Sequence, residues 1–192
     1  MELIIASNNA HKVKEIKEIL GDFFDEIFSM KEVGIDIDVE ETGDTFFANA
    51  MLKARTISEL TGKICLADDS GLRVDYLNGA PGVYSARYAG LEQDDDKNID
   101  KLLSVLNGIK SREANFTTTL VMYYPNGDYL TVEGVTEGEI TLERKGKNGF
   151  GYDPIFYSYE LDKTFGEATD EEKNRVSHRG KALKKLKYNF LQ

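Results

Sequence analysis

The sequence predicts an α/β domain built on a mixed β-sheet, and three observations support this fold class. Short apolar runs typical of buried strands alternate with segments whose apolar residues recur at helical spacing. Two β-rich runs, 114–124 and 129–140, are joined by Pro125-Asn126-Gly127-Asp128, a strong hairpin signal that makes part of the sheet antiparallel. The 192 residues contain no internal repeat and no Pro/Ser-rich linker, so we expect one continuous domain.

The first elements are two strands and two helices. Residues 2–6 predict a buried strand, and Ser7-Asn8-Asn9 offers capping residues for the helix that follows. Residues 45–61 predict a second helix with one apolar face, for which Thr42 is a candidate cap. Residues 63–67 predict another strand, which we expect to end in the acidic turn Asp68-Asp69-Ser70-Gly71.

The later elements complete the alternation. Residues 95–107 predict a third helix, because their leucines and isoleucine recur at helical spacing and Gly108 follows. The hairpin comes next, and Thr169-x-x-Glu172 then has the pattern of a capping box at a helix start. A last helix is predicted over residues 178–190.

The composition excludes several classes of protein. A formal net charge of −10 argues against a nucleic-acid or membrane partner, because both require clustered Lys and Arg, but it does not exclude a small polyphosphate. The single cysteine, Cys65, lies in an apolar run and is expected to be a buried thiol. No segment approaches the roughly 20 apolar residues of a membrane span. We therefore expect a cytoplasmic protein.

A first polar cluster lies between the first strand and the first helix. It consists of Ser7, Asn8, Asn9, Ala10, His11 and Lys12. Backbone N–H groups at a helix start, together with a hydroxyl, amides and a lysine, suit an oxyanion such as phosphate. The alternative is a plain helix cap with a solvated lysine, and the segment alone does not decide between the two.

A second cluster pairs Glu40-Glu41 with Asp68-Asp69. Two or more hard oxygen ligands with open positions are what Mg²⁺ needs, because it keeps waters and bridges to phosphates. A carboxylate beside the metal also suits a general base for water. The alternative is a set of solvated turn acids, which the apolar run before Asp68 disfavours.

Two further clusters suit recognition of a base. Residues 147–154 place glycines beside Phe150 and Tyr152, which offers a stacking face, and Asp153 is a hydrogen-bonding group. Residues 173–179 include Lys173, His178 and Arg179, and a guanidinium can donate to the edge of a 6-oxopurine. The alternatives are a strand corner with core aromatics and a charged helix surface.

Together these segments resemble the inosine triphosphate pyrophosphatase family. Each motif is weak alone, but six in this order are specific, and they span residues 3 to about 186. The matching segments are Ser7-Asn8-Asn9-x-x-Lys12, Glu41-Thr42-Gly43-x-x-Phe46-x-x-Asn49-Ala50-x-x-Lys53-Ala54, Ala67-Asp68-Asp69-Ser70-Gly71-Leu72, Gly79-Ala80-Pro81-Gly82-Val83-Tyr84-Ser85-Ala86-Arg87, Phe150-Gly151-Tyr152-Asp153-Pro154 and Ser177-His178-Arg179-Gly180-x-Ala182.

The resemblance implies a fold and an activity. It implies a single domain over residues 1–192, with two lobes around a long, curved mixed sheet flanked by helices and the active-site cleft between the lobes. It implies Mg²⁺-dependent hydrolysis of non-standard purine nucleoside triphosphates, namely ITP, dITP and XTP, to a nucleoside monophosphate and pyrophosphate. It further implies a homodimer.

The resemblance also implies roles for individual residues. Asp69 would activate water and bind the metal, and Glu40 or Glu41 would complete the metal site. Residues that would hold the substrate are Ser7, Asn8, Asn9, Ala10, His11, Lys12, Lys53 and Ser70 around the triphosphate, and Phe150, Gly151, Tyr152, Asp153, Lys173, His178 and Arg179 around the base.

Three other functions fit parts of the sequence. A nucleotide sensor without catalysis would keep the basic and aromatic clusters but would not need converging acids. An RNA- or partner-binding protein would need a basic face, which the net charge opposes. A glycosidase would use paired carboxylates but leaves Lys12, Lys53 and Lys173 unexplained.

Overall fold

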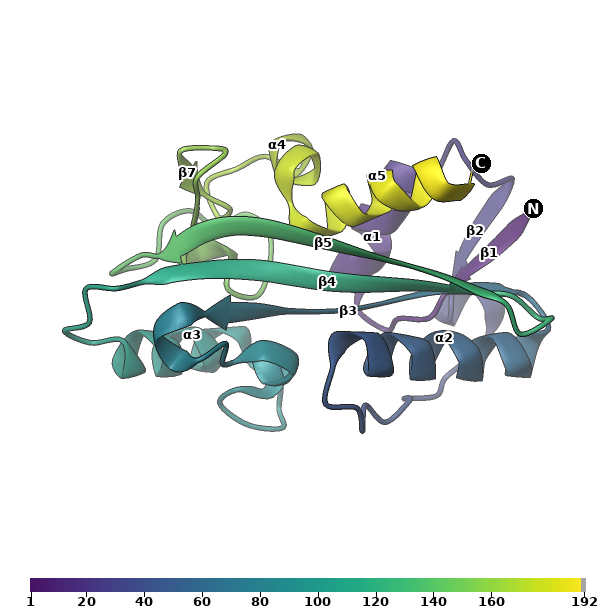
Figure 1. The fold of residues 1–192 in the computed structure, drawn as a ribbon, viewed down its shortest axis with the longest axis horizontal. Coiled ribbons are helices and arrows are strands. Elements are labelled where there is room, and N and C mark those ends of the chain that lie inside the picture. Colours follow the sequence, from purple (N-terminus) through teal and green to yellow (C-terminus); the bar gives the residue numbers. More distant parts are fainter. Residues whose placement is uncertain (191–192) are drawn as a thin grey trace. The chain divides into compact units, whose positions relative to one another are not determined.

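A computed structural model describes residues 1–190 and shows an α/β fold (Figure 1). The helices are α1 (Ala10–Leu20), α2 (Phe46–Thr61), α3 (Asp95–Val105), α4 (Asp170–Val176) and α5 (His178–Phe190). The strands are β1 (Glu2–Ile5), β2 (Glu26–Ser29), β3 (Ile64–Val74), β4 (Glu113–Tyr123), β5 (Tyr129–Ile140), β6 (Phe156–Ser158) and β7 (Lys163–Thr164). Short 3₁₀ helices are η1 (Lys31–Val33), η2 (Asp75–Leu77), η3 (Gly82–Arg87) and η4 (Asp153–Ile155).

The seven strands form one mixed sheet in the order β2-β1-β3-β4-β5-β6-β7. Strand β1 pairs in parallel with β2 and with β3, where Ile5 lies opposite Leu66. Strand β6 pairs antiparallel with both β5 and β7. The predicted α/β class with a mixed sheet is therefore confirmed.

The chain divides into two compact units. Among the described residues, unit 1 contains residues 1–69, 118–134 and 179–190, and unit 2 contains residues 70–117 and 135–178. Strands β3, β4 and β5 contribute residues to both units, so the two units are formed by interleaved segments of the chain. In the part of the chain that the structure describes, no helix is long and apolar enough to cross a membrane.

The strands of unit 1 bury both faces, because successive side chains of a strand point to opposite sides. Leu3, Ile5 and Leu66 belong to a core with residues of α1 and α5, whereas Ile4 and Cys65 belong to a second core with residues of α2. Accordingly, α1 and α5 lie on one side of these strands and α2 on the other (Figure 1). Each fully buried aliphatic side chain contributes roughly 1.5–3 kcal/mol to this packing.

Unit 2 has its own core. Its apolar residues come from the second half of β3, the first half of β4, α3 and α4, and the segment around η4. The rings of Phe116, Phe156 and Phe165 pack against one another with centroids 4.6–6.0 Å apart. This aromatic cluster supports the segment that contains the predicted base-binding residues.

Two local predictions were wrong. Asp68 to Gly71 do not form a turn, because β3 continues through them to Val74. Asp68 and Asp69 can lie in a buried strand because cations and an amide surround their side chains, as described below. The cap of α2 is Thr45 rather than Thr42, and its side chain accepts a hydrogen bond from the N–H of Ala48.

Candidate active site

Strand β3 presents two adjacent carboxylates to opposite sides of the sheet. Asp68 contacts residues of α1 and α5, and Asp69 contacts residues of α2. Both residues are buried. Because a buried carboxylate is costly unless it is paired, the partners of these two residues define the candidate site in unit 1.

Asp68 is the centre of a buried ionic network. The Nε and Nη2 atoms of Arg179 donate to one oxygen of Asp68 over 3.0 and 2.8 Å, and Nη1 donates to Glu15. The ammonium of Lys12 lies 3.3 Å from the other Asp68 oxygen. Burial alone would raise the pKa of Asp68, but the neighbouring cations, Arg179 foremost, outweigh burial and hold this pKa well below its usual range. Asp68 is therefore ionised at neutral pH.

Asp69 has a different environment. Asn49, fully buried on α2, donates to one of its carboxylate oxygens over 3.1 Å, and the hydroxyl of Thr118 donates to its backbone carbonyl over 3.2 Å. Burial raises the pKa of Asp69 to about 6, since Lys53 opposes the shift only in part and Glu41 adds to it. A carboxylate with a pKa near neutrality can both accept and release a proton, as a general base requires.

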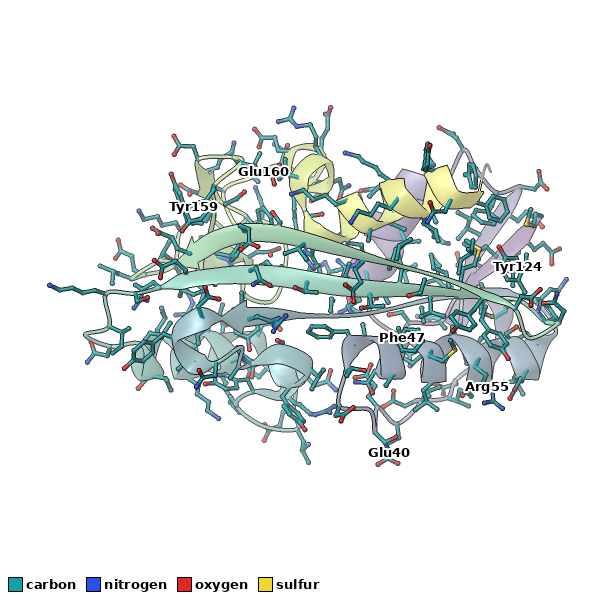
Figure 2. The ribbon with its side chains drawn as sticks, viewed as in Figure 1. Glu40, Phe47, Arg55, Tyr124, Tyr159 and Glu160 are labelled. Carbon is teal, nitrogen blue, oxygen red and sulfur yellow. The ribbon has the colours of Figure 1, made fainter. Side chains whose placement is uncertain are left out.

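Glu41 and Lys53 complete this side of β3. The ammonium of Lys53 donates to Glu41 over 2.5 Å and to the carbonyl of Asp68 over 2.8 Å, and it lies 3.9 Å from a carboxylate oxygen of Asp69. Burial opposes the charge on Lys53, but the carboxylates of Asp69 and Glu41 outweigh burial and raise its pKa. Glu40, in contrast, is exposed and extends outward from the loop before α2 (Figure 2).

The oxygen donors of this side suit Mg²⁺. Within residues 1–190, no group of three or more His, Cys, Asp or Glu side chains is close enough to hold a metal by itself. Mg²⁺ does not need such a group, because it is usually bound by one or two carboxylates, waters and substrate phosphates. Glu41 and Asp69 converge on one positive charge, that of Lys53, and so provide two such carboxylates.

The segment from Ser7 to Lys12 is well ordered by its own side chains. Asn9 caps α1, and its side-chain amide oxygen accepts hydrogen bonds from the N–H groups of His11 and Lys12 over 3.0 and 3.2 Å. The hydroxyl of Ser7 accepts from the N–H of Asn9, and Asn8 donates to the carbonyl of Ile37. Two of the N–H groups expected to face an oxyanion are thus occupied by the cap, which leaves the Lys12 ammonium as the main cationic group of this segment.

In unit 2, Phe150 to Asp153 form a tight turn around one carboxylate. Asp153 accepts hydrogen bonds from the N–H of Phe150 over 3.0 Å and from the buried ammonium of Lys173 over 2.7 Å. This ammonium lies 4.5 Å from the centre of the Phe150 ring. A Cβ on Gly149 would come within 2.0 Å of Asp153, so only glycine fits there. The carboxylate of Asp153 therefore organises the turn and holds Lys173 beside an aromatic face.

Other contacts fix the same turn within unit 2. The phenol of Tyr152 donates to the carbonyl of Ser85 over 2.6 Å, and the N–H of Gly151 donates to Asp95 over 2.9 Å. His178 is buried and stacks on Phe116, with ring centroids 4.9 Å apart. Ser70, the first residue of unit 2, is half-buried in β3.

Three residues that were expected to act together have separate partners in the structure. Lys173, His178 and Arg179 were expected to act together on a base, but each has its own partners, namely Asp153, Phe116 and the Asp68–Glu15 pair. Sequence reasoning assigned no role to Asn49, Glu15 or Thr118. A signal was present for Asn49, which is polar at a position on the apolar face of a helix.

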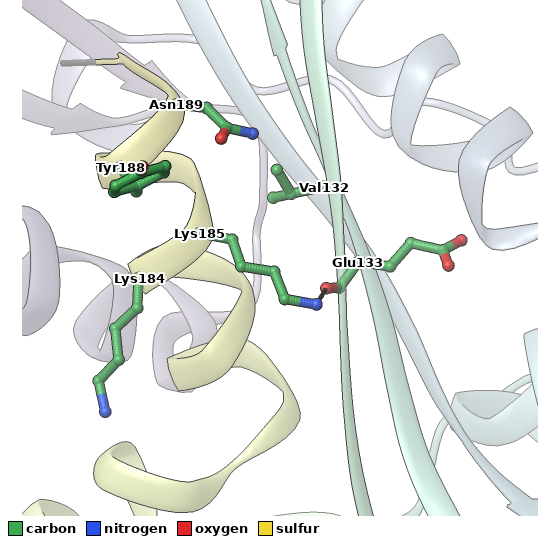
Figure 3. Close-up of a pocket in the computed structure, with 6 residues that line it drawn as sticks. All are labelled: Val132, Glu133, Lys184, Lys185, Tyr188 and Asn189. Atoms are coloured by element: carbon green, nitrogen blue, oxygen red, sulfur yellow. Dashed lines mark hydrogen bonds between the residues drawn. The ribbon is translucent and has the colours of Figure 1, made fainter. Parts of the chain in front are cut away.

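A surface hollow in unit 1 contains none of the predicted residues. It is lined by Val132, Glu133, Lys184, Lys185, Tyr188 and Asn189 (Figure 3). The ammonium of Lys185 donates to the carbonyl of Glu133 over 2.7 Å. The hollow has neither the buried carboxylates nor the paired cations of the Asp68–Asp69 region, so the chemistry places the candidate site at β3.

A family model and several known proteins match nearly the whole chain. The model of the Ham1 family matches residues 3–189. A dITP/XTP pyrophosphatase of Clostridium perfringens is 54% identical over an alignment of 197 residues, gaps included. The alignment covers 98% of this chain and 97% of the relative. A dITP/XTP pyrophosphatase of Bacillus subtilis is 50% identical over 187 residues, which cover 96% of this chain and 94% of the relative.

Solved structures agree with this match. The Ham1 protein of Staphylococcus aureus is 43% identical, with a TM-score of 0.88 over 99% of this chain and 98% of that one. A nucleoside-triphosphatase, dITP/XTP pyrophosphatase, of Mycobacterium abscessus is 42% identical, with a TM-score of 0.77 over 97% of this chain and 98% of that one.

Proposed function

The chain belongs to the Ham1 family, and we propose from this membership that it hydrolyses non-standard purine nucleoside triphosphates (ITP, dITP and XTP) to a nucleoside monophosphate and pyrophosphate. The names of the similar proteins support the substrate class. One observation carries the catalytic part of the proposal. Asp69 is a buried carboxylate with a pKa raised to about 6, held by Asn49 and placed beside Lys53 and Glu41.

The proposed reaction is an attack of water on the α-phosphorus. The oxygen of water forms a bond to this phosphorus, the bond from the α-phosphorus to the bridging oxygen of the β-phosphate breaks, and pyrophosphate leaves with that oxygen. Asp69 accepts the proton of the attacking water. Asn49 keeps the carboxylate of Asp69 oriented, because its amide donates to one oxygen and leaves the other for the water.

Positive charge must balance the triphosphate in this reaction. Lys12 and Lys53 are the two lysines beside the β3 carboxylates, and we propose that they attract the phosphates. We further propose a requirement for Mg²⁺, with Glu41 and Asp69 as the protein ligands and Glu40 left out because of its exposure. Bound there, Mg²⁺ would neutralise charge on the phosphates.

For the base, we propose the turn in unit 2. The ring of Phe150 offers a stacking face, and Lys173 beside it offers donors for the O6 atom of a 6-oxopurine. An adenine would present an amino group to these donors and leave them unpaired, which disfavours ATP. We also propose a homodimer in the cytoplasm, in line with the family resemblance and the single buried cysteine.

Colorimetric phosphate release from ITP, with Mg²⁺ and added inorganic pyrophosphatase, tests the proposal. The wild-type chain should hydrolyse ITP, and Asp69→Asn should lose about 10²–10⁴-fold in kcat while it keeps most of its affinity for the nucleotide. Asp128→Asn, a change in the exposed hairpin turn, should leave kcat unchanged and serves as the control. No Mg²⁺-dependent turnover of ITP by the wild type would refute the activity, and a near-normal kcat of Asp69→Asn would refute the base.

A further inference from the structure

The ammonium of Lys53 occupies a position that the mechanism leaves unexplained. It is bound to a carboxylate oxygen of Glu41 over 2.5 Å and to the carbonyl oxygen of Asp68 over 2.8 Å, with Asp69 3.9 Å away. Only 13% of the Lys53 side chain is exposed. An ammonium has three donors and no acceptor, so these oxygens satisfy most of its binding capacity. In this state little of its charge is available to a phosphate.

The same contact holds the two carboxylates together. Glu41 lies on the loop before α2 and Asp69 lies in β3, and two like charges in a partly buried site repel each other. Lys53 lies on α2, and its ammonium is 2.5 Å from a carboxylate oxygen of Glu41 and 3.9 Å from one of Asp69. Its positive charge offsets the repulsion between the two carboxylates. Glu41 and Asp69 are also the oxygens that a divalent cation would require.

We propose that Lys53 is an exchangeable internal counter-cation. In the nucleotide-free protein its ammonium holds Glu41 beside Asp69, and it gives up these carboxylates to a divalent cation, which frees the ammonium for the phosphates of the substrate. This inference rests on the proposed function and adds a role for Lys53 that is separate from simple attraction of the triphosphate.

The exchange couples two binding events. A positive charge beside a cation site weakens cation binding, so Lys53 lowers the affinity of the nucleotide-free protein for a divalent cation. Phosphates that bind the released ammonium remove this repulsion. The divalent cation and the triphosphate therefore favour each other's binding through Lys53, in addition to their direct contact.

Mn²⁺ binding to the nucleotide-free protein tests the proposal, with the free ion measured by electron paramagnetic resonance. Lys53→Met should bind Mn²⁺ with a roughly tenfold lower Kd than the wild type, because the competing charge is gone. Lys63→Met is a matched control, since Lys63 also pairs with a glutamate, Glu2, but at an exposed site of the same unit. Its Kd should equal that of the wild type.

Two further variants separate the possible failures. Glu41→Gln should weaken Mn²⁺ binding, and an unchanged Kd there would refute the metal site of the proposed function. If Glu41→Gln weakens binding but Lys53→Met binds Mn²⁺ no more tightly than the wild type, the metal site stands and the exchange role of Lys53 is refuted. Lys53→Gln, which keeps a polar donor, carries the same prediction and replaces Lys53→Met if the methionine variant does not fold.

Discussion

Substitution of Arg179 by methionine tests whether the buried network around Asp68 stabilises the protein. The change removes three charged hydrogen bonds, two to Asp68 and one to Glu15, and keeps an apolar side chain of similar length. Arg179 is 1% exposed, so water cannot replace the lost donors. Two buried carboxylates would be left without their common cation.

Removal of one partner of a buried ion pair costs about 3–5 kcal/mol. Lys12 remains 3.3 Å from Asp68, so we expect the lower end of this range, about 3 kcal/mol. For a protein of this size each kcal/mol lowers the melting temperature by roughly 2–4 °C, which predicts a decrease of roughly 6–12 °C.

Thermal and urea unfolding of three proteins would measure this effect. The control is Arg55→Met, because Arg55 forms a 2.8 Å pair with Glu59 in which both side chains are more than half exposed (Figure 2). An exposed pair of this kind contributes only about 0.3–0.5 kcal/mol. Equal losses in the two variants would show that the network around Asp68 does not stabilise the fold.

The loss of stability in Arg179→Met, relative to the wild type, should depend on pH. The pKa of Asp68 is depressed in the folded state, so its contribution is fully present above the unfolded-state carboxyl pKa of about 4 and is lost as the pH falls through the folded value. The difference in unfolding free energy between the wild type and Arg179→Met should therefore narrow below about pH 4. A difference that widens on acidification would contradict the assigned ion pair.

Three further predictions concern single positions. Glu41→Gln should lose most of the ITP hydrolysis measured at saturating Mg²⁺, whereas Glu40→Gln, at an exposed neighbour, should keep it; equal losses would contradict the choice of Glu41. Gly71→Ala should lower the midpoint of urea unfolding, because a Cβ would lie 2.1 Å from the carbonyl oxygen of Gly82, and overpacking of this kind costs about 1–3 kcal/mol. Burial raises the pKa of the Cys65 thiol to about 11, so a thiol reagent should label it quickly at pH 8 only in the unfolded protein. Fast labelling of the native protein would contradict this burial.

Much of the fold could be predicted from local patterns. The predicted helix over 178–190 matches α5, and the runs 114–124 and 129–140 match β4 and β5 to within one residue. These elements have a strong apolar period, which is the most reliable signal in a sequence. The prediction failed at Asp68-Asp69, where the charges indicated a turn. Their partner Arg179 lies 111 residues away in the sequence, and no local pattern shows that the charge is neutralised.

The candidate site could be predicted in part. The residue types that suit phosphate and metal chemistry were visible in the sequence, and the structure brings Glu41, Lys53 and Asp69 together in one local group. The grouping of Lys173 with Arg179 followed proximity in the sequence, but their side chains bind different carboxylates. Which donor binds which carboxylate depends on tertiary packing, and sequence spacing carries little information about it.

The alternation of side chains along β3 has a consequence for insertions and deletions. The side chain of Asp68 contacts α1 and α5, and that of Asp69 contacts α2. The pairing of Ile5 with Leu66 fixes the register between β1 and β3. Loss or gain of one residue between Leu66 and Asp68 would exchange the sides of the two carboxylates, so that the one with the lowered pKa and the one with the raised pKa would trade places. A gain of two residues would keep each carboxylate on its own side but would move it about 6.6 Å along the strand, out of reach of Asn49 and Arg179. Length changes in this part of β3 should therefore separate both carboxylates from their partners, whether the number of residues changed is odd or even.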